Sequence, residues 1–167
     1  MIISDDNIIH NFDKKGKKIK GWRNKKNTDK ISAPLRHFKI NKRDYILEET
    51  NSSSSRLLAL NGSNRVTYDK STKFNGRQIN ISKDGTLHAI TLDGKLWKGN
   101  TNGNSSEITV AELDSNSILH IHSKSQEEQY FAIANQNILT ITNSDFEELH
   151  SLRFKEKITK IFSIGDK

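Results

Sequence analysis

The sequence contains no cysteine, a single proline and no long apolar run among its 167 residues. Without cysteine, a disulfide framework, a thiol nucleophile and a thiolate metal site are all excluded. No apolar stretch approaches the roughly 18 residues that a membrane-spanning helix needs, so we expect no transmembrane segment. Residues 1–10 carry acids where a signal peptide has bases, which predicts no signal peptide. The chain is then either cytoplasmic or a piece of a longer extracytoplasmic protein, and its compartment stays open.

Apolar residues are scarce as well, at 32 % of the chain. Leu, Ile, Val and Phe together number 42, which places the chain above the floor of about 20 % below which chains usually stay disordered. The length suits one domain, which we expect to span residues 1–167. A core built from so few apolar side chains must be thin or divided among several sheets.

Helical spacing of apolar residues is nearly absent, and short alternating runs rich in isoleucine recur in its place. Such alternation is typical of half-buried strands and predicts an all-β chain. Asn61-Gly62, Asp84-Gly85 and Asp93-Gly94 stand between runs, where hairpin turns need residues that tolerate a positive φ. The expected strands are 2–4, 7–13, 17–22, 35–40, 44–48, 56–61, 65–68, 78–82, 86–92, 95–98, 107–113, 117–122, 129–134, 137–142, 147–154 and 157–164.

The strands also form a repeat. When Ile9, Leu57, Leu87 and Ile138 are taken as equivalent, they lie 48, 30 and 51 residues apart. A spacing of roughly 40–50 residues is typical of a four-stranded propeller blade. We therefore expect a β-propeller-like chain of about four blades, each with four antiparallel strands.

The expected blades divide the chain unevenly. Blade 2 spans 35–74, blade 3 spans 76–113 and blade 4 spans 117–154, whereas blade 1 combines strands within 2–22 with a last strand at 157–164. Three arrangements stay open: a closed small ring, a half-ring that pairs with a second copy, and a fragment of a larger propeller. Four blades is the lower limit for this architecture, which favours the last two. Unpaired edge strands in either arrangement would promote self-association.

Two blade endings resemble those of PQQ-like and WD40-like propeller repeats. The residues are Asn11 to Gly16 and Leu92 to Trp97, where a strand ends in Asp or Asn and turns at Gly, and where the second returns to a Trp. The resemblance implies a β-propeller fold. The family includes both quinoprotein dehydrogenases and scaffolding modules, so the fold does not select between these functions.

Positive charge is concentrated in the segment 14–30, which has nine basic residues against Asp29 alone. Its net charge of +8 exceeds the +7 of the whole chain. The segment predicts a surface that binds an acidic protein partner. The alternatives are electrostatic binding of nucleic acid or an anionic membrane surface, and an ordinary solvated loop. Nucleic acid is less favoured, because the segment is rich in Lys and Arg is the better phosphate ligand. The candidate binding residues are Lys14, Lys15, Lys17, Lys18, Lys20, Trp22, Arg23, Lys25 and Lys26. Of these, Trp22 is expected to cap a blade core rather than to stack on a base.

The histidines of the sequence are best explained by structural roles rather than by a metal or catalytic site. His120 and His122 share one face of an expected strand, but no further residue at metal spacing accompanies them, so we expect no metal site. His10 and His88 occupy equivalent repeat positions and are expected to form inter-strand hydrogen bonds. The chain has no nucleophile elbow, phosphate-binding loop or dinucleotide motif. The sequence therefore predicts a non-catalytic, cofactor-free interaction module.

Overall fold

The computed structural model describes residues 1–23, 30–50, 55–68, 72–74, 79–110, 113–123, 125 and 128–162. Over these residues the chain forms fourteen β-strands and no helix, which confirms the all-β prediction. The described residues accordingly contain no helix with the length and apolarity needed to cross a membrane. The chain divides into two compact units: unit 1 is Met1–Thr72 with Thr101–Gly103, and unit 2 is Lys73–Asn100 with Asn104–Lys167.

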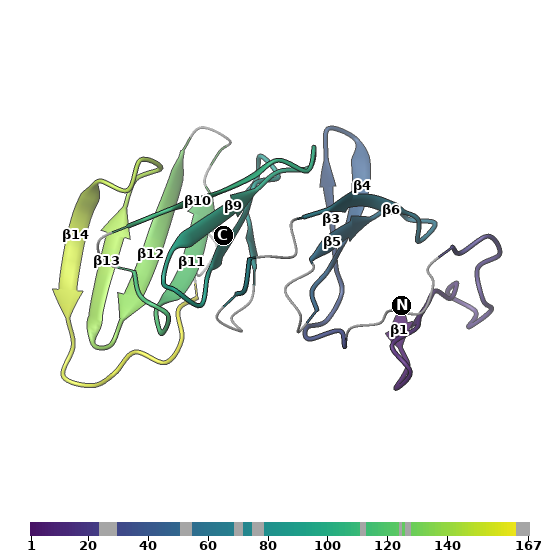
Figure 1. Cartoon of the computed structure of the whole chain (residues 1–167), viewed down its shortest axis with the longest axis horizontal. Helices are drawn as coiled ribbons and strands as arrows, with labels where there is room; N and C mark the ends of the chain where they lie inside the picture. The colour runs from purple at the N-terminus through teal and green to yellow at the C-terminus, as the bar shows by residue number, and fades with distance from the viewer. Residues whose placement is uncertain are drawn as a thin grey trace. The chain divides into compact units, whose positions relative to one another are not determined.

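Unit 1 contains a two-stranded sheet and a four-stranded sheet (Figure 1). The first pairs β1 (Ile2–Ile3) with β2 (Ile9–His10). The second runs in chain order through β3 (Arg36–Ile40), β4 (Arg43–Glu48), β5 (Arg56–Leu58) and β6 (Asn64–Thr67).

Unit 2 contains two four-stranded sheets (Figure 1). The first joins β7 (Asn80–Ile81), β8 (Leu87–Ile90), β9 (Leu96–Gly99) and β10 (Ser105–Ile108). The second joins β11 (Ile118–Ser123), β12 (Gln129–Asn135), β13 (Ile138–Thr142) and β14 (Glu148–Arg153). Every pairing is antiparallel and each strand pairs with its neighbours in sequence.

The three four-stranded sheets fall within the three expected groups 35–74, 76–113 and 117–154. The strands form at these positions because their residues alternate between a buried face and a more exposed face. In β12, for example, Phe131 and Ile133 are buried while Tyr130 and Ala132 on the other face are only half-buried. A strand with one apolar face can bury that face only against another layer, which fixes its register.

In each unit, buried apolar residues of both sheets pack into a common cluster. In unit 1, Ile9 of β2 packs with Ile46 of β4 and Leu58 of β5, and Trp22 lies against this cluster. In unit 2, the core combines residues from both four-stranded sheets, namely Ile90, Leu96, Val110, Leu119, Phe131 and Ile133. Both clusters are small, with three and six buried residues.

The three predicted glycine turns are present. Gly62, Gly85 and Gly94 all have positive φ, at 80°, 86° and 80°. At Gly94 a second constraint operates, because a Cβ atom there would lie 2.8 Å from the Asp114 Cα. This turn therefore needs glycine both for its backbone conformation and for the close approach of another chain segment.

The prediction for blade 1 was wrong in two places. The expected strand 17–22 contributes only an isolated bridge between Phe12 and Lys18, because turns on either side of Lys18, at Gly16 and Gly21, leave too few residues for a ladder. The described part of the expected strand 157–164, residues 157–162, forms no strand. There the Ile158 N–H donates instead to the Gln136 carbonyl in unit 2, at the turn between β12 and β13.

Candidate functional site

The basic hairpin, defined here as residues 14–23, begins at a turn organised by Asp13. The Asp13 carboxylate accepts the backbone N–H groups of Lys15 and Lys17, at 2.8 and 3.0 Å. The Asp13 carbonyl accepts the N–H of Gly16, and Gly16 adopts a φ of 77°. The one carboxylate next to the lysines is therefore occupied by backbone donors, and the lysine side chains are left to solvent.

All six cations of the basic hairpin are exposed: Lys14, Lys15, Lys17, Lys18, Lys20 and Arg23. Within the part of the chain that the structure describes, none of them forms an ion pair. Like charges at this density repel one another, so an acidic partner would relieve their repulsion on binding. The other two predicted binding residues, Lys25 and Lys26, lie outside the described residues.

Trp22 has a different role from its basic neighbours. Its indole Nε1–H donates to the Ile9 carbonyl oxygen at 2.7 Å, and its half-buried ring packs on the core of unit 1. The next residue is also tied down, because the Arg23 N–H donates to the Asn61 carbonyl at 2.6 Å. The structure thus separates Trp22 from the predicted set: it anchors the hairpin while the cations extend from it.

The acids of the neighbouring sheet in unit 1 are already paired. The Arg36 guanidinium bonds Glu49 at 2.8 Å, and the Arg56 guanidinium bonds the fully buried Glu48 at 2.7 Å. Asp44 lies 2.8 Å from the His37 ring. The three acids of this sheet are therefore matched by neighbouring cations and are not available to neutralise the hairpin.

The two repeat-equivalent histidines differ in their contacts. His10 Nε2 lies 3.1 Å from the Ser4 hydroxyl across the β1–β2 pair, as expected for an inter-strand hydrogen bond. His88 has the opposite environment: it is buried, and neither ring nitrogen has a hydrogen-bond partner among the described residues. The prediction for His88 was therefore wrong, because the repeat indicated the position of the ring but not what surrounds it.

The remaining histidine pair is on one strand, as predicted. His120 is half-buried on β11 and His122 is exposed. Burial, and then the nearby His122, lowers the pKa of His120. Across the described residues, no group of three or more His, Cys, Asp or Glu side chains is arranged to hold a metal ion.

Sequence reasoning missed a polar hollow in unit 2 around His88 and Lys98. Its side chains come from four separate segments between Asp84 and Ser144. Only the β8–β9 pairing places His88 opposite Lys98, and no motif in the sequence signals that proximity.

Comparison with known proteins gives little further information. No protein-family profile matches the sequence, and no curated protein is similar to it. Among solved structures, the chain is similar to a crystal structure of a protein of unknown function from Bacteroides caccae, with 11 % identity and a TM-score of 0.46. The similarity covers 90 % of this chain and 58 % of that protein, so the chain spans less than two-thirds of its length.

Proposed function

We propose that this protein is a non-catalytic interaction module that binds an acidic protein segment through the basic hairpin. The observation that supports this most directly is the set of six exposed cations without ion pairs, held on a hairpin that Trp22 fixes to the core. A rigid base reduces the conformational entropy lost on binding, and clustered positive charge accelerates the encounter with an acidic partner.

An acidic protein fits this surface better than nucleic acid does. Five of the six described cations are lysines, which act as point charges without the paired geometry that Arg offers to phosphate. The one large aromatic side chain of the hairpin, Trp22, is engaged with the core and with Ile9, so it does not offer a base a free ring face.

The architecture that we propose for this module is of the propeller type, as the blade-ending resemblance implied. Its support is the repeated pattern of consecutive antiparallel sheets that share a core face to face, seen within unit 2 between the β7–β10 and β11–β14 sheets. The mass in solution, measured by light scattering, distinguishes a half-ring that pairs with a second copy from a monomer. A half-ring predicts twice the chain mass of 19.1 kDa in solution, whereas a monomer would contradict it.

The binding proposal is tested by removing the same number of positive charges from two different places. We compare a variant with Lys14, Lys15, Lys17 and Lys18 changed to Gln with a control in which the exposed Lys73, Lys155, Lys157 and Lys160 are changed to Gln. Fluorescence anisotropy of a labelled poly-glutamate peptide is measured at rising salt. The hairpin variant should lose about tenfold in affinity at low salt and the control should lose little, because the proposed partner contacts the hairpin and not the control lysines.

Three outcomes decide the proposal. Selective loss in the hairpin variant supports it, and equal losses in both variants would mean that only net charge matters. A labelled poly-dT oligonucleotide is titrated in parallel. If it binds more tightly than the peptide at the same salt concentration, the surface is a nucleic-acid site and the protein-binding proposal is wrong.

A further inference from the structure

Unit 2 contains a hollow of about 320 Å³ between its two four-stranded sheets. Thr86, His88 and Lys98 line it from the β7–β10 sheet, and Gln129 and Ser144 line it from the β11–β14 sheet. The hollow thus lies where polar side chains of two different sheets converge, and it is separate from the basic hairpin in unit 1. A concave site with a few convergent polar groups is a typical place for a small ligand.

His88 is the most unusual residue of this lining. Only 3 % of it is exposed, its ring packs edge-on to Phe131 with centroids 5.1 Å apart, and both ring nitrogens lack a partner. Burial, and then the charge of Lys98, lowers the pKa of His88 to about 4, so the ring is neutral near pH 7. A neutral imidazole carries one donor and one acceptor, and buried polar groups are nearly always paired. An imidazole that no described protein group satisfies, beside a hollow, is suited to bond a polar ligand placed there.

Two charged residues of opposite sign, Lys98 and Asp84, line the hollow together with His88. Lys98 lies directly across the β8–β9 ladder from His88, and its Nζ sits 4.9 Å from the centre of the Phe146 ring. Within the described residues Lys98 forms no ion pair. Asp84 also lines the hollow, and its carboxylate accepts the N–H and the hydroxyl of Thr86, at 3.0 and 2.8 Å. A free anion would meet the Asp84 carboxylate as well as the Lys98 ammonium, which disfavours an anionic ligand.

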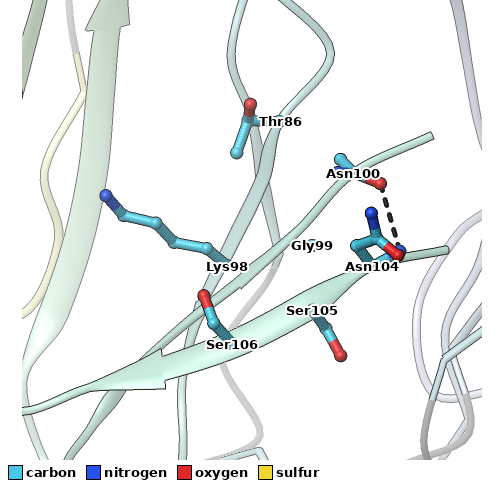
Figure 2. A pocket seen from close by; sticks show the side chains of 7 residues that line it. All are labelled: Thr86, Lys98, Gly99, Asn100, Asn104, Ser105 and Ser106. Carbon is cyan, nitrogen blue, oxygen red and sulfur yellow. Dashed lines mark hydrogen bonds between the residues drawn. The ribbon is translucent and has the colours of Figure 1, made fainter. Parts of the chain in front are cut away.

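A second hollow of about 240 Å³ adjoins the first and shares Thr86 and Lys98 with it (Figure 2). Figure 2 shows the Lys98 side chain extending away from Asn100 and Asn104. The backbone N–H of Asn104 donates to the side-chain oxygen of Asn100 at 3.2 Å. Apart from Lys98, the second hollow is lined by uncharged groups: Thr86, Gly99, Asn100, Asn104, Ser105 and Ser106. Hydroxyl and amide side chains both donate and accept hydrogen bonds.

We propose that the two hollows bind a short neutral oligosaccharide, one sugar ring in each, with Lys98 and Thr86 at their junction. Sugar hydroxyls donate and accept hydrogen bonds, which matches a lining of hydroxyls, amides and one unpaired imidazole with balanced charge. The volumes lie at or below the low end of known ligand pockets, as expected for single rings. This site is independent of the basic hairpin and assigns the protein a second ligand.

The test is a titration of the full ¹⁵N-labelled chain with maltotriose, cellotriose and triacetylchitotriose, followed by amide chemical shifts. At least one trisaccharide should shift the amides of Thr86, Lys98 and Gln129 in a saturable way at millimolar concentration. Changing Lys98 to Met should lower the affinity about tenfold, as loss of a good polar contact does. The exposed Lys155, outside both hollows, provides the matched control: Lys155→Met should bind like the unchanged protein.

A second variant guards against misfolding. Ser106 is exposed and lines only the second hollow, so Ser106→Ala should preserve the fold and weaken the trisaccharide but not glucose. Inorganic phosphate and citrate are titrated in parallel. The proposal is overturned if none of the three trisaccharides shifts these amides, if the anions do so and the saccharides do not, or if Lys155→Met weakens binding as much as Lys98→Met.

Discussion

The indole Nε1–H of Trp22 donates to the carbonyl oxygen of Ile9 over 2.7 Å, and this bond joins the basic hairpin to a core residue with no exposed surface. This bond and the one from the Arg23 N–H to the Asn61 carbonyl tie the end of the hairpin to unit 1. The hairpin is presented as a fixed surface for this reason, although its own backbone forms only one bridge.

Trp22→Phe keeps an aromatic ring but removes this donor. We expect it to lower the free energy of unfolding by about 1 kcal/mol, the net value of a typical hydrogen bond. Urea unfolding followed by far-ultraviolet circular dichroism measures it. Ile19→Ala, on an exposed side chain of the same hairpin, should change stability by less than about 0.5 kcal/mol. Equal effects of the two changes would contradict the anchoring role.

The buried ion pair of Glu48 and Arg56 gives a second prediction. Glu48 is fully buried, and its Oε1 accepts two bonds from the Arg56 guanidinium, at 2.7 and 2.9 Å. Arg56→Met leaves a buried carboxylate without its cation and should cost about 3–5 kcal/mol of stability. Adding Glu48→Met should recover much of that loss, because the uncompensated charge is then gone. A double variant as unstable as Arg56→Met would contradict the electrostatic explanation.

Alanine substitutions at two glycines with similar backbone angles distinguish the cost of backbone strain from the cost of a steric clash. Gly16 and Gly94 have φ values of 77° and 80°, but a Cβ atom meets open space at Gly16 and the Asp114 backbone at Gly94. Gly16→Ala should cost about 1 kcal/mol, since it incurs only the left-handed strain. Gly94→Ala should cost more than about 2 kcal/mol, because the strain and the displaced backbone add. Thermal unfolding of the two variants compares them, and equal costs would contradict the close approach at Gly94.

His88 makes stability depend on pH in a definite direction. Its pKa is lowered from the ordinary 6.5 to about 4, so the unfolded chain binds more protons between these values and acid favours unfolding. The free energy of unfolding should fall as the pH drops from about 6.5 towards 4, by up to about 3 kcal/mol from this residue.

The matched variant for this prediction is His88→Phe, which also removes two unpaired buried nitrogens. It should be about 1 kcal/mol more stable than the unchanged protein near pH 7 and should lack this part of the acid sensitivity. Urea midpoints at pH 4.5 and pH 7 measure both effects. Parallel pH profiles for the two proteins would show that His88 does not titrate as described.

Much of the fold could be predicted from local pattern, because alternation and turn residues act over short distances. Gly62, Gly85 and Gly94 marked turns correctly, and β3 and β4 begin one residue from the expected starts. In residues 17–22 the alternation of apolar and polar residues is weak. The turns at Gly16 and Gly21 therefore determine the local structure, and no strand forms. For residues 157–162, the chain bonds to Gln136 rather than to the first sheet, a choice between distant partners that no local pattern records.

The candidate sites also differ in whether they are formed by residues that are neighbours in sequence. The basic hairpin was predictable because its charge is contiguous in sequence, whereas the unpaired ring of His88 depends on Lys98 and Phe131, which belong to other strands. A core contact was expected for Trp22, whereas its bond to the Ile9 carbonyl joins residues 13 apart and had no local signal in the sequence.

The central claim is that an acidic partner binds at the basic hairpin, and amide chemical-shift mapping with an unlabelled poly-glutamate peptide tests it most directly. We predict shifts concentrated in residues 14–23 that weaken as salt is raised, because the interaction is electrostatic. Shifts that are absent there, or that are centred instead on the exposed lysines at 155–160 in unit 2, would contradict the proposed function.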